Sequence, residues 1–262
     1  MAESVIKTRR EGAILEVTLD RPKVNAIDLA TSRLMGQTFK AFRDDPELRV
    51  AIVHTAGDKF FSAGWDLKAA ANGDAVDGDY GVGGFAGLQE LRDLNKPVIA
   101  AVNGMAVGGG FELALSADLI YATTHSSFAL PEIRAGTLAD AATVKLPKRI
   151  PYHIAMDLLF TGRWMAVQEA ERWGLVNEVL TDEAALMARV WAVARLLASG
   201  PPLVFAAIKE VAREAEAMGF QEAMNYITKR KFATVDVLYD SKDNLEGFKA
   251  FAEKRAPVWQ GK

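Results

Sequence analysis

The sequence contains no cysteine, which excludes disulfide bonds, thiolate nucleophiles and metal sites built on sulfur. Its only three histidines are His54, His125 and His153, and none has a second histidine four residues away, as a helical zinc pair would. Neither residue type therefore offers a metal-ligand pattern, and we expect no metal site.

The chain also lacks a strong charge of either sign and any long apolar run. It has 31 basic and 34 acidic residues, a formal net charge of −3, which gives no electrostatic case for a nucleic-acid or anionic membrane partner. The most apolar stretch, Val98–Val107, is interrupted by Asn103 and Gly104 and falls far short of the roughly 20 residues that span a bilayer. The first twelve residues have no apolar core typical of a signal peptide, so the expected location is the cytoplasm.

The first half of the chain alternates short apolar runs with helical patterns. The segment Leu29–Phe42 repeats apolar residues at helical spacing, with Leu34, Met35, Thr38, Phe39 and Phe42 on one side and Asp28 as a plausible N-cap. Strands alternating with helices predict an α/β fold with a mostly parallel sheet. The predicted strands are Ile14–Leu19, Val50–His54, Val98–Val102 and Leu119–Tyr121.

After about residue 140 the strand patterns fade and helices dominate. Residues 1–200 are therefore expected to form the core domain, and residues 201–262 a helical C-terminal region. The segment Ala71–Gly87, with six glycines, predicts a mobile loop, either functional or a tolerated surface insertion. The helices predicted in the second half span 152–161, 166–173, 182–199, 202–217, 219–231 and 243–254.

Three consecutive glycines stand between an apolar strand and the predicted helix Phe111–Ala117. Glycines at a helix start let its free N–H groups approach a ligand, and the positive end of the helix dipole favours an anion or a developing oxyanion. Glu112 falls in the first turn of this helix. The alternative is a tight strand-to-helix turn in which Glu112 only complements the dipole. The glycine spacing does not fit a dinucleotide or phosphate loop.

Two further segments carry candidate chemistry. Glu132 follows an apolar run, and apolar surroundings favour the neutral form of a carboxyl group that must exchange protons near neutrality, although a solvated loop glutamate is the plainer interpretation. Asp140 is a third acid/base candidate, or the N-cap of a helix over Ala141–Leu146 that Pro147 ends. Small residues beside two aromatics in Phe60–Lys68 suggest a backbone that approaches a ligand closely.

Taken in order, these segments resemble the crotonase (enoyl-CoA hydratase/isomerase) family. The motifs are F-S-A-G-x-D-L-K, then N-G-x-A-x-G-G-G-x-E-L-A-L-x-A-D, then F-x-L-P-E and L-P-K, and the resemblance covers nearly the whole chain. Within the family, the chain resembles one branch more closely than the others, and residues 42–52, 59–71, 85–88 and 251–261 carry this narrower resemblance.

The resemblance implies a crotonase-like spiral of ββα turns with a helical C-terminal region that serves oligomerisation and active-site closure, assembled as a homotrimer or a dimer of trimers. It implies an acyl-CoA substrate, with coenzyme A part of that substrate and no separate cofactor. The implied oxyanion hole is the backbone N–H groups of Trp65 and Gly109, and the implied catalytic pair is Glu112 and Glu132. The coenzyme A contacts implied are Ala63, Asp66, Leu67 and Lys68.

The chain departs from the family near the second glutamate. Members of the family commonly have Pro-x-x-Gly-Gly there, whereas this chain has Ala139, Asp140, Ala141 and Ala142. The expected activity is hydration of a 2-enoyl-CoA, or dehydration of a 3-hydroxyacyl-CoA. Ala139 and Asp140 also resemble dienoyl-CoA isomerases, which makes isomerisation with Glu132 and Asp140 the alternative. A non-catalytic binding protein with this fold is the alternative from another class.

Overall fold

The computed structural model describes residues 4–75 and 77–262, so Val76 of the predicted loop lies outside the described residues. Ten described strands form two sheets, with the orders β1-β2-β3-β5-β7-β10 and β4-β6-β8-β9. The strands are β1 (Ile6–Glu11), β2 (Ile14–Leu19), β3 (Val50–Thr55), β4 (Phe60–Ser62), β5 (Val98–Val102), β6 (Met105–Val107), β7 (Leu119–Thr123), β8 (Ser127–Ala129), β9 (Trp164–Ala166) and β10 (Glu178–Leu180).

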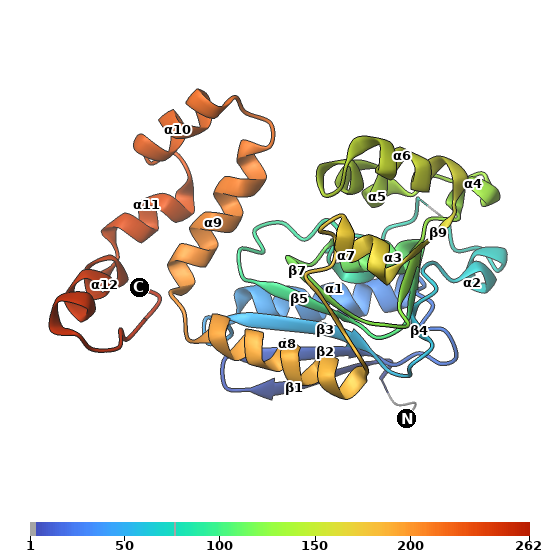
Figure 1. Ribbon diagram of the computed structural model, residues 1–262, viewed down its shortest axis with the longest axis horizontal. Coiled ribbons are helices and arrows are strands. Elements are labelled where there is room, and N and C mark those ends of the chain that lie inside the picture. The colour runs from blue at the N-terminus through green and yellow to red at the C-terminus, as the bar shows by residue number, and fades with distance from the viewer. Residues whose placement is uncertain (1–3, 76) are drawn as a thin grey trace.

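The helices lie around the sheets and, at the C-terminus, beside them (Figure 1). Two short 3-10 turns, η1 (Phe85–Gly87) and η2 (Leu146–Lys148), interrupt the loops. The α-helices are α1 (Leu29–Asp44), α2 (Leu67–Ala71), α3 (Gly109–Leu115), α4 (Glu132–Ala135), α5 (Asp140–Lys145), α6 (Tyr152–Thr161), α7 (Val167–Arg172), α8 (Glu183–Ala198), α9 (Pro202–Ala215), α10 (Phe220–Thr228), α11 (Ala233–Asp240) and α12 (Lys242–Glu253).

Three successive turns of the chain each give one strand to each sheet. The strand pairs β3/β4, β5/β6 and β7/β8 are followed by α2, α3 and α4. Neighbouring turns pair in parallel, β3 with β5 and β5 with β7 in the large sheet, and β4 with β6 and β6 with β8 in the small one. The predicted spiral of ββα turns is thereby confirmed.

Asn103 and Gly104 form the corner between β5 and β6. The buried Asn103 side chain donates to the Thr55 carbonyl oxygen at 3.1 Å and to that of Gly57, and accepts from the Thr55 hydroxyl at 3.1 Å. A Cβ on Gly104 would lie 2.7 Å from the carbonyl carbon of Lys59, so only glycine fits there. These contacts hold the β5/β6 corner against the preceding turn of the spiral, and so help to position the helix that follows, α3.

Helix α1 follows the sequence prediction with one correction. Its N-cap is Asp28, whose side chain accepts from the Thr31 N–H, as expected. Leu34, predicted on the buried side, is instead 40% exposed. The buried face of the helix includes Ser32 and Gly36 instead, because these small residues pack against the loop that carries η1. The Ala86 N–H donates to the Ser32 hydroxyl, and a Cβ on Gly36 would lie 3.3 Å from Gly83 N.

Helix α8 packs against the outer face of the large sheet, where Trp191 and Val190 meet Ile52 and Ile99. Beyond it, α9–α12 lie to one side of the sheets in Figure 1 and enclose a small core of their own around Ala207, Phe232 and Val235. Among the described residues no single helix is long and apolar enough to cross a membrane; α8 and α9 together reach that length and composition, but across a 103° bend.

Candidate active site

The glycine triplet lies where the small sheet meets α3. Gly108 has φ +54°, and α3 begins at Gly109, which places Glu112 in the first turn as the sequence predicts. Gly64 of the preceding spiral turn has φ +79°, and a Cβ there would lie 2.6 Å from Gly109 N. Backbone of two spiral turns therefore comes together at a point that tolerates no side chain.

Trp65 and Gly109 stand at this point of close approach. Throughout residues 4–75 and 77–262, no hydrogen-bond acceptor is found for either backbone N–H group. The neighbouring groups are occupied: Ala63 N–H donates to the Val24 carbonyl at 2.9 Å, and Asp66 N–H to that of Ile27 at 2.9 Å. The two donors that the family resemblance implies therefore have no acceptor among the described residues and are available to a ligand oxygen.

Glu112 is buried and held at both carboxylate oxygens. Oε1 accepts from the Ala142 N–H at 2.9 Å, and Oε2 accepts from the Gln89 side-chain amide at 3.1 Å. Burial raises the pKa of Glu112 above its ordinary value, while these two donors act in the opposite direction. The side chain is therefore fixed in one orientation and does more than complement the helix dipole.

Glu132 is the first residue of α4 and differs sharply from Glu112. Its Oε1 lies against Gly108, where a Cβ would be 2.6 Å away, and its Oε2 is buried without any partner in the described part of the chain. Burial raises the pKa of Glu132 to about 7, and the negative charges of Glu112 and Asp140 add to the effect. A solvated loop glutamate would show neither property, so this carboxyl group is poised to exchange a proton near neutrality.

Asp140 does not cap a helix, which corrects one of the two roles considered for it. The N-cap of α5 is Ala139, no side chain caps that helix, and Asp140 lies inside its first turn. The Asp140 carboxylate is exposed and has no hydrogen-bond or ion-pair partner among the residues described, yet its charge raises the pKa of both Glu112 and Glu132. It therefore adds negative charge at the rim of the glutamate pair.

The segment proposed to contact coenzyme A is organised by Arg21. Its guanidinium bridges Asp28, the cap of α1, at 2.8 Å and Asp66, the cap of α2, at 2.7 Å. The Asp66 side chain also accepts from Lys68 N–H, while Leu67 is 70% exposed. The four residues Ala63, Asp66, Leu67 and Lys68 thus lie together at the edge of the site, with Leu67 and Lys68 facing outward.

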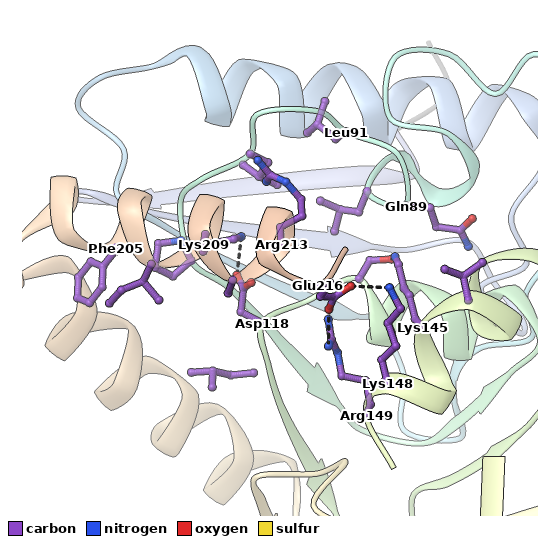
Figure 2. Close-up of a pocket in the computed structure, with 18 of the residues that line it drawn as sticks. Gln89, Leu91, Asp118, Lys145, Lys148, Arg149, Phe205, Lys209, Arg213 and Glu216 are labelled. Carbon is purple, nitrogen blue, oxygen red and sulfur yellow. Dashed lines mark hydrogen bonds and ion pairs between the residues drawn. The ribbon is translucent and has the colours of Figure 1, made fainter. Parts of the chain in front are cut away.

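A cavity of about 630 Å³ lies between α9 and the core (Figure 2). Gln89 lines it and reaches Glu112, and Lys145 lines it while donating to the Ser116 hydroxyl at 2.9 Å. Burial lowers the pKa of Lys145 to about 8, against the opposing effect of Glu112. Lys209 of α9 pairs with Asp118, and Glu216 just beyond α9 pairs with Lys148, so ion pairs fasten this part of the chain to the core.

The sequence analysis did not identify Gln89 or Lys145 as site residues. Neither belongs to a catalytic motif, and only the packing of the η1 loop and α5 against α3 brings them to Glu112 and Ser116. Groups of three or more His, Asp or Glu residues that could hold a metal ion do not occur in the described residues.

Comparison with known proteins supports the family resemblance that the sequence motifs indicate. The family model "Enoyl-CoA hydratase/isomerase" matches residues 9–262. Carnitinyl-CoA dehydratase from Salmonella arizonae is 54% identical over 262 residues, covering all of both chains. This confirms the narrower resemblance of residues 42–52, 59–71, 85–88 and 251–261, which is to carnitinyl-CoA dehydratase.

Solved structures agree in fold. Enoyl-CoA hydratase from Mycobacterium tuberculosis H37Rv superposes with a TM-score of 0.89 at 36% identity, covering 99% of this chain and all of that one. Carnitinyl-CoA hydratase from Mycobacterium avium superposes with a TM-score of 0.76 at 38% identity over the full length of both. Matched along nearly its whole length in both sequence and fold, the chain belongs to the enoyl-CoA hydratase/isomerase family of enzymes.

Proposed function

We propose that this protein is a lyase that adds water reversibly to a 2-enoyl-CoA thioester, with crotonobetainyl-CoA and carnitinyl-CoA as its substrate pair. The observation that carries the proposal is the pair of unlike glutamates beside two free backbone donors. The likeness to carnitinyl-CoA dehydratase supports the choice of acyl group.

In the proposed mechanism the thioester oxygen accepts from the N–H groups of Trp65 and Gly109. Negative charge develops on that oxygen as water adds, and one such donor is worth on the order of 3 kcal/mol in the transition state. Both donors are fixed by the backbone, so they need no reorganisation as the charge appears. This makes the C2 position accessible to acid/base chemistry by a carboxyl group.

The glutamates divide the proton transfers. Glu112, held by two donors, orients the water and takes one of its protons as the water oxygen bonds to C3. Glu132, with an unpartnered oxygen and a pKa of about 7, gives a proton to C2. Dehydration reverses both transfers, and no separate cofactor takes part in either direction. Coenzyme A would lie along Ala63, Asp66, Leu67 and Lys68.

The test is the absorbance of the enoyl-thioester band with purified protein and three substrates. We expect the band of crotonobetainyl-CoA to fall fastest, that of crotonyl-CoA more slowly, and 3,5-dienoyl-CoA to remain unchanged. Faster turnover of crotonyl-CoA would overturn the carnitine assignment but keep the hydratase. If the protein binds coenzyme A esters but converts none of the three substrates, the alternative of a non-catalytic binding protein would replace the proposed enzyme.

Isomerisation stays the second candidate because of one observation. Asp140 is unpartnered among the described residues and acts electrostatically on Glu132, as the second acid/base group of a dienoyl isomerase would. Formation of a conjugated 2,4-dienoyl product without hydration of the other two substrates would select this reaction.

A further inference from the structure

An aromatic wall runs outward from the proposed oxyanion hole. The Phe85 ring lies directly over Gly109, where a Cβ would be 2.6 Å from Cζ of that ring. Tyr80 then packs edge-on against Phe85, with ring centroids 5.4 Å apart and planes at 78°. The acyl chain of a thioester bound at Gly109 therefore has Phe85, and beyond it Tyr80, within its surroundings.

Negative charge surrounds the outer end of this wall. Burial raises the pKa of Tyr80, and the charges of Asp74, Asp140 and Asp77 raise it further, in that order. Asp140 is the first residue of α5, two residues before the Ala142 N–H that holds Glu112, and its charge also raises the pKa of Tyr80. The potential at the Tyr80 ring is thus one that favours a cation.

We propose that Tyr80, Phe85 and Asp140, supported by Asp74, form a subsite for a quaternary ammonium group on the acyl chain. The inference rests on the proposed function and names its specificity-determining residues. A trimethylammonium group is large, apolar on its surface and positively charged, so aromatic faces and nearby carboxylates attract it without hydrogen bonds. In carnitinyl-CoA this group is only a few bonds from the thioester carbonyl.

The departure at residues 139–142 fits this role. Ala141 and Ala142 keep the start of α5 compact, Ala142 N–H holds Glu112, and Asp140 is left exposed two residues away. The same short helix thereby orients the catalytic carboxylate and presents a free negative charge to the acyl chain.

The test compares crotonobetainyl-CoA with 5,5-dimethylhex-2-enoyl-CoA, a neutral analogue in which carbon replaces the ammonium nitrogen. The readout is the ratio of kcat/KM for the charged over the neutral substrate. We expect Asp140→Asn and Tyr80→Leu each to lower this ratio at least tenfold, and Tyr80→Phe to keep it near the wild-type value because the ring is retained. The matched control is Asp79→Asn. Asp79 belongs to the same loop as Tyr80, but its side chain is 83% exposed and pairs with Arg33, so the ratio of kcat/KM for the two substrates should not change.

Unchanged ratios in Asp140→Asn and Tyr80→Leu would overturn the subsite while leaving the hydratase in place. Equal loss of both substrates in Asp140→Asn would also overturn it, because Asp140 would then act on the reaction itself, directly or through the pKa of the two glutamates, and not on the ammonium group. If the wild-type protein hydrates neither substrate, it is the proposed function that fails, and this is separable from the other two outcomes.

Discussion

At the scale of single residues, Glu112 and Glu132 are chemically identical side chains placed in opposite surroundings. Glu112 has a donor on each oxygen, whereas Oε2 of Glu132 is buried without one. We expect Glu112→Gln and Glu132→Gln each to lower kcat by about 10²–10⁴-fold, the usual contribution of a general acid or base. Affinity for a coenzyme A ester, measured by titration calorimetry, should change little, because neither side chain is proposed to hold the nucleotide.

Near-wild-type turnover of either variant on a substrate that the parent hydrates would remove that glutamate from the mechanism. Glu90→Gln is the matched control, since Glu90 is an exposed glutamate close to Gln89 in the chain but outside the proposed chemistry. Its kcat should stay within about twofold of the parent.

The raised pKa of Glu132 also has a cost in stability. The folded pKa of about 7 lies above the ordinary 4.5, so between these values the unfolded chain releases a proton that the folded chain retains. The stability that protonated Glu132 contributes is therefore fully present below pH 4.5. It is lost as pH rises toward 7, which lowers the free energy of unfolding by at most about 3 kcal/mol. We expect Glu132→Gln to be more stable than the parent at pH 8 and nearly equal to it at pH 4.5, in urea unfolding curves.

Glu112→Gln should not share this gain. Its carboxylate accepts from Ala142 and Gln89, and an amide at that position must present its NH2 group to one of these two donors. A stability gain at pH 8 in Glu112→Gln, or none in Glu132→Gln, would contradict the assigned environments.

At the scale of elements, the active site depends on how closely η1 approaches the start of α3. A Cβ on Gly109 would lie 2.6 Å from Phe85 Cζ, so Gly109→Ala must displace either the ring or the helix start. We expect Gly109→Ala to lower kcat by roughly 10- to 100-fold, by moving an oxyanion donor. Phe85→Leu removes the closest ring atoms, so the double variant should recover much of that loss in a double-mutant cycle of kcat.

Additive losses in that cycle would show that Gly109 and Phe85 do not compete for the same space. Gly219→Ala serves as the control for a glycine-to-alanine change, because a Cβ there meets nothing within 4 Å and the site is remote in sequence. Its kcat should equal that of the parent.

The elements also show what sequence could and could not predict. The four predicted strands are confirmed as β2, β3, β5 and β7, because three of them are short buried apolar runs and Ile14–Leu19 alternates branched with polar residues. The strands β4, β6, β8, β9 and β10 have only three residues each, too few for any periodicity, and β1 is mostly charged and exposed. Helix α11 was also missed.

The same distinction applies to the site. Glu112 and Glu132 could be predicted since each stands in a motif next to an apolar run. Gln89 and Lys145 could not, because their contacts with Glu112 and Ser116 join segments more than twenty residues apart and arise only on packing. The sequence allows two roles for Asp140, acid/base group or helix cap, and only the structure shows that it does not cap α5.

At the scale of the whole molecule, the C-terminal helices are both fastened to the core and unusually apolar outside. Arg49 donates to the carbonyl of Trp259 at 2.9 Å, and the buried Asp243 accepts from Gln260 and Gly261, both at 2.8 Å, so the tail is folded back onto α12. The exposed apolar side chains on α10–α12 include Phe220, Leu245, Phe248 and Phe251. Side chains of this size rarely face water in such number without a protein partner.

We therefore propose that α10–α12 pack against other copies of the chain in a trimer or a pair of trimers. Phe248 and Phe251 are 71% and 87% exposed in the single chain, so replacing them with glutamate should leave the fold intact and shift the assembly toward monomer. Sedimentation velocity measures this directly, and far-ultraviolet circular dichroism checks the fold. Lys249→Gln is the control: it lies on the same helix and changes the charge by −1, as each single Phe→Glu substitution does, but removes no apolar side chain, so the assembly should not change. A wild-type monomer at micromolar concentration, or glutamate variants that assemble like the parent, would mean that these faces serve another purpose.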